Sequence, residues 1–333
     1  MIIMKSTPVE SKSHGPVEHG RFGMSEPTVE KLKLYKKKVT QTWRVYRKNW
    51  MGMLGLGILT FFLAMAVFAP QIVWMLSVIG GWDHAYDPFE QVSTTRLVTP
   101  PSPEHWLGTD IRGYDILTRV IYGSRVSLEI GLVATIVSMG LGTAVGLLSG
   151  FWAGWRDEVM MRITDVFLVL PWLVLMIVFA AVLPGGASVG KVVFVIGITG
   201  WSSTARIVRA QVFSLKERAF IERARAIGAG DYYIVRKHIF PNVFPLVFAN
   251  SILTVALSIL SESTLSYIGL GPMANQVVTW GNMLQDADDG KAILNGLYLW
   301  ILVPGMCIVF LVLAFTFIGY AMDEIYNPKL RKR

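Results

Sequence analysis

Six long apolar runs restrict this chain to one kind of fold. The clearest of them, at 130–155, contains no charged residue. A helix of about 20 apolar residues spans the hydrocarbon core of a bilayer, whereas an open sheet edge in lipid leaves backbone groups unpaired. Of the 333 residues, 53% are hydrophobic and only 16% are charged. We therefore predict an all-α membrane protein with six transmembrane helices, at 51–74, 130–155, 163–183, 192–209, 243–268 and 297–322.

The distribution of Lys and Arg predicts the orientation of these spans. If the N-terminus lies inside, the inner segments hold 25 of the 31 basic residues; these segments are 1–50, 151–162, 206–241 and 323–333. Basic residues accumulate on the cytoplasmic side of a membrane. Both termini are therefore predicted to be cytoplasmic, in a multi-pass protein of the inner (cytoplasmic) membrane. The net charge of +8 then reflects topology and anionic lipid headgroups, and nucleic acid is not needed to explain it.

The polar segments define the predicted domain boundaries. Residues 1–29 are expected to form a disordered cytoplasmic tail, because they are polar and rich in Ser, Pro, Gly and His. Residues 30–50 are strongly basic and read either as a helix on the membrane surface or as a plain positive-inside flank. The spans occupy 51–322, and 323–333 form a C-terminal tail. The outer loop 77–125 combines aromatic residues with prolines, which favours a folded cap or, alternatively, an aromatic belt.

Glycines in the second span indicate a packing face. Gly142, Gly146, Gly150 and Gly154 recur every four residues, so they share one face of a helix. Glycine at such positions lets another helix approach closely. The pattern predicts tight helix–helix contact and says little about function.

No pattern in the sequence points to catalysis or to a cofactor on this chain. The segment from Gly185 to Lys191 matches the start of a phosphate-binding loop, but Val192 stands where Ser or Thr would hold magnesium, and the segment follows a membrane helix. Histidines are scattered, and Cys307 is the one cysteine. We therefore expect a protein that is not an enzyme and that binds neither a cofactor nor a metal.

Two acids within the predicted spans are candidates for function, because charge is costly in the membrane. Asp165 follows Arg162 by three residues, which favours a local ion pair on one helix face. Glu262 lies between Ser261 and Ser263 near the outer end of the fifth span. It either lines a path through the protein or, as we favour, reaches the membrane interface.

The segment 206–241 is the most specific part of the chain. It carries eight basic and three acidic residues between two apolar spans. Its alanines favour helix, Gly228 and Gly230 favour a turn, and Pro241 is expected to stop a helix. We predict a short helix, a glycine turn and a second short helix that leads into the fifth span. Its charges would set register and orientation in a partner protein.

This segment resembles a known motif. Glu222, Arg223 and Ala224, then Gly228, and finally Phe240 and Pro241 are similar to the E-A-A-x-x-x-G … L-P loop of ATP-binding-cassette (ABC) importer permeases. Arg223 replaces the usual alanine and Phe240 the usual leucine, which bears on the choice of partner. The stretches 105–110 and 113–128, with Trp201 and Trp280, are similar to the second (C-type) subunit of the dipeptide/oligopeptide/nickel transport family.

The resemblance implies a type I ABC importer permease fold and a set of partners. These are a homologous permease in a heterodimer, two ABC ATPase subunits that bind ATP and Mg, and an extracytoplasmic substrate-binding protein. Membrane lipid is a further expected partner of this chain. It also implies roles for single residues. The ATPase-coupling loop, 210–241, would act through Glu222, Arg223, Ala224, Arg225, Gly228, Ala229, Arg236 and Pro241. The translocation path would include Glu262 and Trp201, and the cap would dock the binding protein through Trp82, Trp106 and Asp110.

The sequence therefore predicts a permease subunit of an ATP-driven importer of di- and oligopeptides. Oligosaccharides are the alternative cargo, and nickel is a weaker one because the spans hold no histidine or cysteine cluster. A secondary transporter driven by an ion gradient would need inverted repeats and ionisable residues at the midplane, neither of which is evident. A membrane scaffold or receptor without transport is the third class.

Overall fold

The computed structural model describes residues 36–37, 40–81, 87–92 and 98–326. The predicted tail 1–29, Trp82 and residues 327–333 lie outside the described residues. The chain divides into two units, 1–48 and 49–333. In the first unit residues 40–46 are helical, and the rings of Trp43 and Tyr46 stack with their centroids 5.9 Å apart. The second unit contains all the apolar helices.

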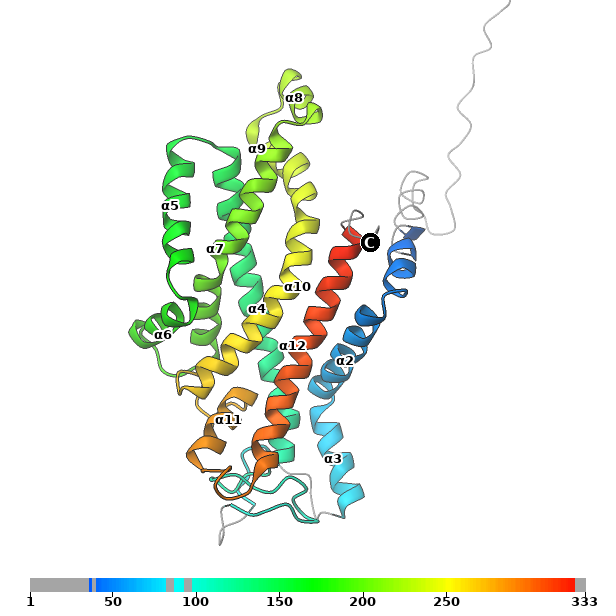
Figure 1. Ribbon diagram of the computed structural model, residues 1–333, viewed down its shortest axis with the longest axis vertical. Helices are drawn as coiled ribbons and strands as arrows, with labels where there is room; N and C mark the ends of the chain where they lie inside the picture. The colour runs from blue at the N-terminus through cyan, green and yellow to red at the C-terminus, as the bar shows by residue number, and fades with distance from the viewer. Residues whose placement is uncertain (1–35, 38–39, 82–86, 93–97, 327–333) are drawn as a thin grey trace, which may run out of the picture. The chain divides into compact units, whose positions relative to one another are not determined.

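The second unit is helical in nearly all its described parts, which confirms the predicted fold class (Figure 1). Five helices are long and apolar enough to cross a membrane, and a sixth span is formed if one bent pair counts as a single crossing. The five are α2 (Trp50–Val67), α4 (Ile116–Phe151), α7 (Val189–Lys216), α10 (Phe240–Tyr267) and α12 (Tyr298–Tyr326). The helix α12 thus runs four residues past the predicted end of the last span.

The third span is broken rather than straight. It consists of α5 (Trp155–Val169) and α6 (Trp172–Val182), which are bent by 99° relative to each other. The break falls at Leu170 and Pro171, and Leu170 is extended with φ −71° and ψ 136°. Proline lacks an N–H and pushes the residue before it out of the helical region, so the helix cannot continue. The first predicted span is also interrupted next to a proline. It consists of α2 and the short helix α3 (Ala69–Gly80), which has a proline in its first turn.

The packing of α4 against α7 confirms most of the predicted glycine face. A Cβ added to Gly142 or Gly146 would lie 2.5 or 2.6 Å from a backbone oxygen of α7, and one added to Gly150 would lie 2.7 Å from Val212. Only glycine permits this distance between the two helices. The prediction was wrong for Gly154, because α4 ends at Phe151 and Gly154 lies beyond it with φ 101° and open space around its Cα.

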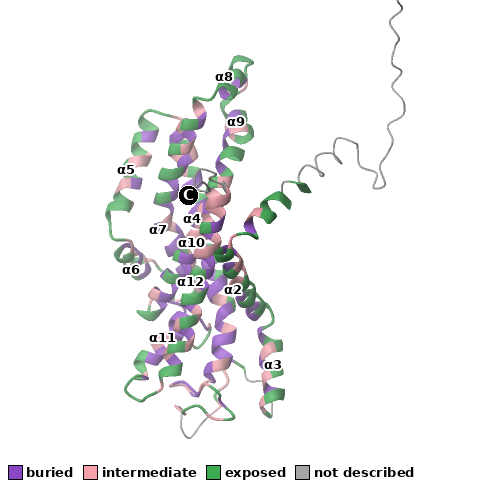
Figure 2. Cartoon of the chain, turned by 45° about the vertical axis from the view of Figure 1, so that its right-hand side comes forward, coloured by how far each residue is buried: buried purple, intermediate pink, exposed green. Residues whose placement is uncertain are grey.

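The two ends of the bundle differ, and we call them the α8 end and the α11 end. Toward the α11 end, α2, α4, α10 and α12 enclose a core with the short helix α11 (Trp280–Asp289), and Trp280 and Trp300 are buried in it. Figure 2 shows that burial is concentrated on α4, while α3 and α5 are largely exposed. At the α8 end a second apolar cluster joins α4, α7 and α10 to the segment that resembles the coupling loop.

Candidate functional site

The segment between α7 and α10 forms a compact projection, which we call the α8 knob (residues 219–239). It contains α8 (Ala219–Ala226), α9 (Asp231–Ile234) and a π-helical turn (Val235–Ile239) that leads into α10. The helix α8 ends in a Schellman motif: the Ala229 N–H donates to the Ala224 carbonyl and the Gly228 N–H to the Arg225 carbonyl. Gly228 has φ +85°, the left-handed conformation this motif requires. The knob therefore has the form that the sequence predicts, a helix, a glycine turn and a second short helix.

Buried side chains fix the α8 knob to the spans. Ile221 of α8 and Ile234 of α9 are both fully buried, and they pack with Phe151 of α4 and with Val208 and Val212 of α7. The knob is thereby attached to several helices at once. A force applied to it reaches the ends of α4, α7 and α10 together, because close-packed interiors transmit displacement.

The knob presents charged and apolar side chains outward. Glu222, Arg223, Arg225 and Arg236 are exposed, as expected for docking residues. Ala224, in contrast, is 7% exposed and packs inward, so it shapes the knob from within.

Sequence reasoning missed the large apolar residues of the exposed surface. Ile227 is 86% exposed at the tip, where α8 ends, and Tyr232 and Tyr233 of α9 are 71% and 53% exposed. Large apolar residues at the turn of a charged loop were the signal that could have identified them, since exposed apolar groups of this kind mark interaction sites.

Pro241 does not stop a helix as predicted. It lies in the first turn of α10, and the helical path is continuous from Asp231 to Tyr267. Proline has no backbone N–H to donate to the preceding turn. The chain accommodates this by widening that turn into the π-helix Val235–Ile239. The side-chain amide of Asn242 donates to the carbonyl of His238 at 2.6 Å.

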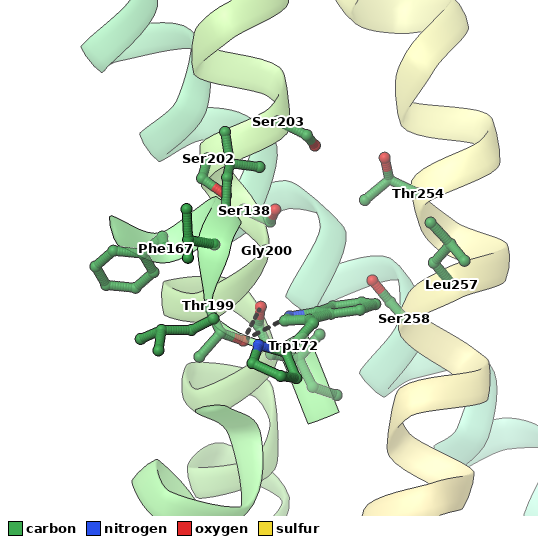
Figure 3. Close-up of a pocket in the computed structure, with 15 residues that line it drawn as sticks. Ser138, Phe167, Trp172, Thr199, Gly200, Ser202, Ser203, Thr254, Leu257 and Ser258 are labelled. Atoms are coloured by element: carbon green, nitrogen blue, oxygen red, sulfur yellow. Dashed lines mark hydrogen bonds between the residues drawn. The ribbon is translucent and has the colours of Figure 1, made fainter. Parts of the chain in front are cut away.

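A pocket of about 450 Å³ opens where the third span is broken (Figure 3). Its lining comes from the α5–α6 break, α4, α7 and α10. Trp172, at the start of α6, extends across the pocket toward α10, and its Nε1 donates to Thr199 Oγ1 of α7 at 3.1 Å. Six lining residues carry hydroxyl groups: Ser138, Thr199, Ser202, Ser203, Thr254 and Ser258.

The two residues predicted for the translocation path lie outside this lining. Trp201 is 8% exposed, and its ring is 5.3 Å from that of Phe167, which does line the pocket. Glu262 is fully buried, so the expectation that it reaches the membrane interface was wrong. Its carboxylate accepts from Ser266 Oγ at 2.8 Å and from Ser263 Oγ at 3.4 Å.

Ion pairs hold α5 against α7. Asp165 pairs with Arg206 at 2.5 Å rather than with Arg162, so the predicted local pair was wrong; Arg162 lies 3.7 Å from Glu158 instead. The long-range partner is available because α5 runs beside α7, which spacing along one helix does not reveal. A second pair, between Asp157 and Arg209, is bidentate, with distances of 2.7 and 2.6 Å.

The described part of the outer loop is folded around a buried charge cluster. Asp110 is 1% exposed; its Oδ1 accepts from the backbone N–H groups of Arg112 and Tyr114, and its Oδ2 pairs with Arg119 at the start of α4. Arg119 also lies 3.2 Å from Asp286 of α11. Burial raises the pKa of the Asp110 carboxyl, and Arg119 opposes this effect. Asp110 therefore faces inward and holds the loop against α11.

Of the aromatic residues predicted for docking in this loop, Trp106 is 39% exposed, and its indole N–H donates to the Pro103 carbonyl. Trp82 lies outside the described residues.

Fold and site together define a polytopic membrane permease whose spans enclose an uncharged pocket. Residues 142–332 match the family model of the binding-protein-dependent transport system inner membrane component, and 39–101 match that of the N-terminal TM domain of oligopeptide transport permease C. The chain belongs to this family of ABC importer permeases, which are multi-pass proteins of the inner cell membrane.

Similar proteins are peptide permeases. The chain is 34% identical to the dipeptide transport system permease protein DppC of Bacillus subtilis, over 87% of this chain and 85% of that protein. It is 36% identical to the oligopeptide transport system permease protein OppC of the same organism, over 86% and 88%. The glutathione transport system permease protein GsiD of Pectobacterium atrosepticum is 34% identical, over 80% and 87%.

A solved structure shares the fold. The chain resembles a chain from inward-facing conformations of the MetNI methionine ABC transporter, with a TM-score of 0.50 and 19% identity, over 64% of this chain and 97% of that one. This likeness supports the type I ABC importer permease fold.

Proposed function

We propose that this chain is the permease subunit of an ATP-driven, binding-protein-dependent importer of di- and oligopeptides. It forms half of the translocation path, and a homologous permease forms the other half in a heterodimer. The observation that carries the proposal is the α8 knob, whose exposed tip is fixed to the ends of α4, α7 and α10 by one buried cluster. The names of the similar permeases support peptides as the cargo.

The proposed coupling runs through the α8 knob. Two ABC ATPase subunits bind ATP and Mg and receive the knob, with Glu222, Arg223, Arg225 and Arg236 setting its orientation by charge. When the ATPases come together the knob moves with them, and the seat formed by Phe151, Val208 and Val212 carries the movement into the spans. Binding of a ligand or of ATP shifts the permease between inward- and outward-facing states only as far as the two states differ in their affinity for it.

At the α11 end, the cap is the proposed docking surface for an extracytoplasmic substrate-binding protein. Trp106 is the exposed aromatic residue available to it. Asp110 and Arg119 act from within, by holding the cap on α4 and α11. The basic residues of 30–50 are proposed to contact anionic lipid on the cytoplasmic face.

One observation favours oligosaccharides as a second candidate cargo. Trp172 places an indole ring in the pocket beside uncharged hydroxyl groups, and aromatic rings with hydroxyl groups also suit the faces and edges of sugars. The names of the similar permeases favour peptides over this alternative.

Reconstitution tests the proposal. The chain is purified with its partner permease and ATPases, placed in proteoliposomes, and supplied with binding protein and labelled tripeptide. We expect uptake that requires ATP and the binding protein. Uptake driven by a sodium or proton gradient without ATPase subunits would instead identify a secondary transporter, and oligosaccharide uptake alone would identify the second cargo.

A further inference from the structure

The pocket at the α5–α6 break is polar yet carries no charge. None of its fifteen lining residues, all within the described part of the chain, has an ionisable side chain. Its hydroxyl groups come from α4, α7 and α10, so they surround the cavity rather than line one wall. Such a surface offers hydrogen bonds without offering a partner for an ion.

Three of the six hydroxyl groups around the pocket already have protein partners. Thr199 Oγ1 accepts from Trp172 and donates to the Val195 carbonyl at 2.8 Å, and Thr254 Oγ1 donates to the Asn250 carbonyl at 3.0 Å. Ser258 Oγ lies 3.1 Å from Thr135 Oγ1. These groups are fixed in place by the protein itself.

The hydroxyl groups of Ser138, Ser202 and Ser203 have no hydrogen-bond partner among the described residues, and Ser138 is the most deeply buried of the three. Its side chain is 1% exposed, and its Oγ has no hydrogen-bond partner within the described residues. An unmade hydrogen bond of a buried hydroxyl is unfavourable, so such groups are normally satisfied. In Figure 3 this hydroxyl lies beside Gly200, in the wall of the cavity. Its hydrogen-bonding capacity is unused, but the Oγ atom has less than 1 Å² of accessible surface, so contact with a bound molecule requires a small movement of the cavity wall.

Gly200 lies directly against Ser138 and leaves room for such a movement. A Cβ added there would lie 3.0 Å from Ser138 Oγ and 3.7 Å from Trp172 Cζ2. Any other residue at this position would occupy the space between the hydroxyl and the indole. The glycine, the unpaired hydroxyl and the aromatic ring thus form one local binding surface.

We propose that this surface binds the neutral main-chain amides of a peptide in transit, with Ser138 Oγ as a direct contact. The inference rests on the proposed function and specifies what the path recognises. A hydroxyl both donates and accepts, so it serves a peptide N–H or a carbonyl equally. Because no lining group pairs with an ion, the pocket does not distinguish acidic from basic cargo, and selection by charge occurs elsewhere.

The test uses the full complex with ATPases, partner permease and binding protein. Ser138→Ala is expected to lower trialanine uptake about fivefold, the effect of one net hydrogen bond. Gly200→Ala is expected to lower it by at least as much, since its Cβ enters the binding surface. Gly140→Ala is the matched control, because a Cβ at Gly140 of α4 meets nothing within 4 Å, and its uptake is expected to equal that of the wild type.

A charge introduced into the pocket provides a gain-of-selectivity test. Uptake is measured for tripeptides with a central Lys and with a central Glu, and the Lys uptake is divided by the Glu uptake. This ratio in each variant is then divided by the wild-type ratio, so that the preference of the binding protein cancels. Ser138→Asp is expected to raise this quotient about tenfold or more, and Ser138→Ala to leave it near one.

The outcomes separate this inference from the proposed function. If the wild-type complex takes up no tripeptide, the proposed function fails. If it does, and both Ser138→Ala and Gly200→Ala match it while the assembled complex is intact, the inference is overturned. A quotient unchanged by Ser138→Asp overturns it as well. Loss of oligosaccharide uptake alone in the two alanine variants assigns the pocket to sugars and overturns the peptide assignment.

Discussion

At the scale of single residues, Glu262 shows how an acidic residue inside the membrane can be structural. It is fully buried in α10, and it is surrounded by hydroxyl groups rather than by a cation among the described residues. The acid lies next to the N-terminus of α11, since Thr279, the N-cap of that helix, also contacts it. We interpret Glu262 as the residue that fixes α11 to α10.

Replacing Glu262 tests this interpretation. Glu262→Ala is expected to destabilise the protein by about 2–4 kcal/mol, because it leaves a cavity and unpaired hydroxyls. Glu262→Gln keeps the shape and part of the hydrogen bonding, so its cost should be about half as large. Thermal unfolding in nanodiscs measures both, with the exposed Glu129→Ala as the control. Equal losses for Ala and Gln would show that the acid does not hold α11 through these bonds.

Gly228 is required for its conformation rather than for lack of space. Its φ of +85° is costly for other residues, although nothing lies within 4 Å of a Cβ built there. Gly228→Ala should therefore cost about 1 kcal/mol of local stability, and it should lower ATP-dependent uptake by loosening the knob. Gly230→Ala is the control, because Gly230 has φ −70° and equally open surroundings. Equal uptake by the two variants would contradict the role given to the turn.

At the scale of elements, the α8 knob joins a charged surface to an apolar tip. Ile227→Asp is expected to reduce co-purification of the ATPase subunits several-fold, because an exposed apolar residue at the centre of a contact contributes much of its free energy. Leu294→Asp serves as the control, since Leu294 is 82% exposed at the α11 end. If both variants retain the ATPases equally, the tip of the knob is not part of the contact.

The sequence predicts the class of the spans and, if the bent α5–α6 pair counts as one crossing, their number, because apolar length and the absence of charge act locally. It predicts the form of the knob for the same reason, because glycine adopts the left-handed conformation of this turn without a steric cost. It did not predict the α5–α6 break, although Pro171 signalled it, or the pairing of Asp165 with Arg206. These depend on which helices lie side by side. The pocket could not be predicted at all, since its lining joins four separate helical segments.

At the scale of the whole molecule, the two ends of the bundle differ in charge. The basic residues of the spans and their connections are concentrated toward the α8 end, and the positive-inside rule therefore predicts that the knob lies on the cytoplasmic side. Cys307 is the one cysteine of the chain and is partly buried. A Cys307→Ser background consequently allows single cysteines to be placed at either end without interference.

Two such positions decide the topology. Tyr232 is 71% exposed on the knob, and Leu294 is 82% exposed at the α11 end. In intact cells a membrane-impermeant maleimide should label Leu294→Cys and spare Tyr232→Cys, and permeabilised cells should show labelling of both. Because the proposed ATPase partners would bind ATP in the cytoplasm, labelling of Tyr232→Cys from outside would remove the knob from their reach. That result would overturn the coupling assignment together with the orientation, even though the fold and the family would stand.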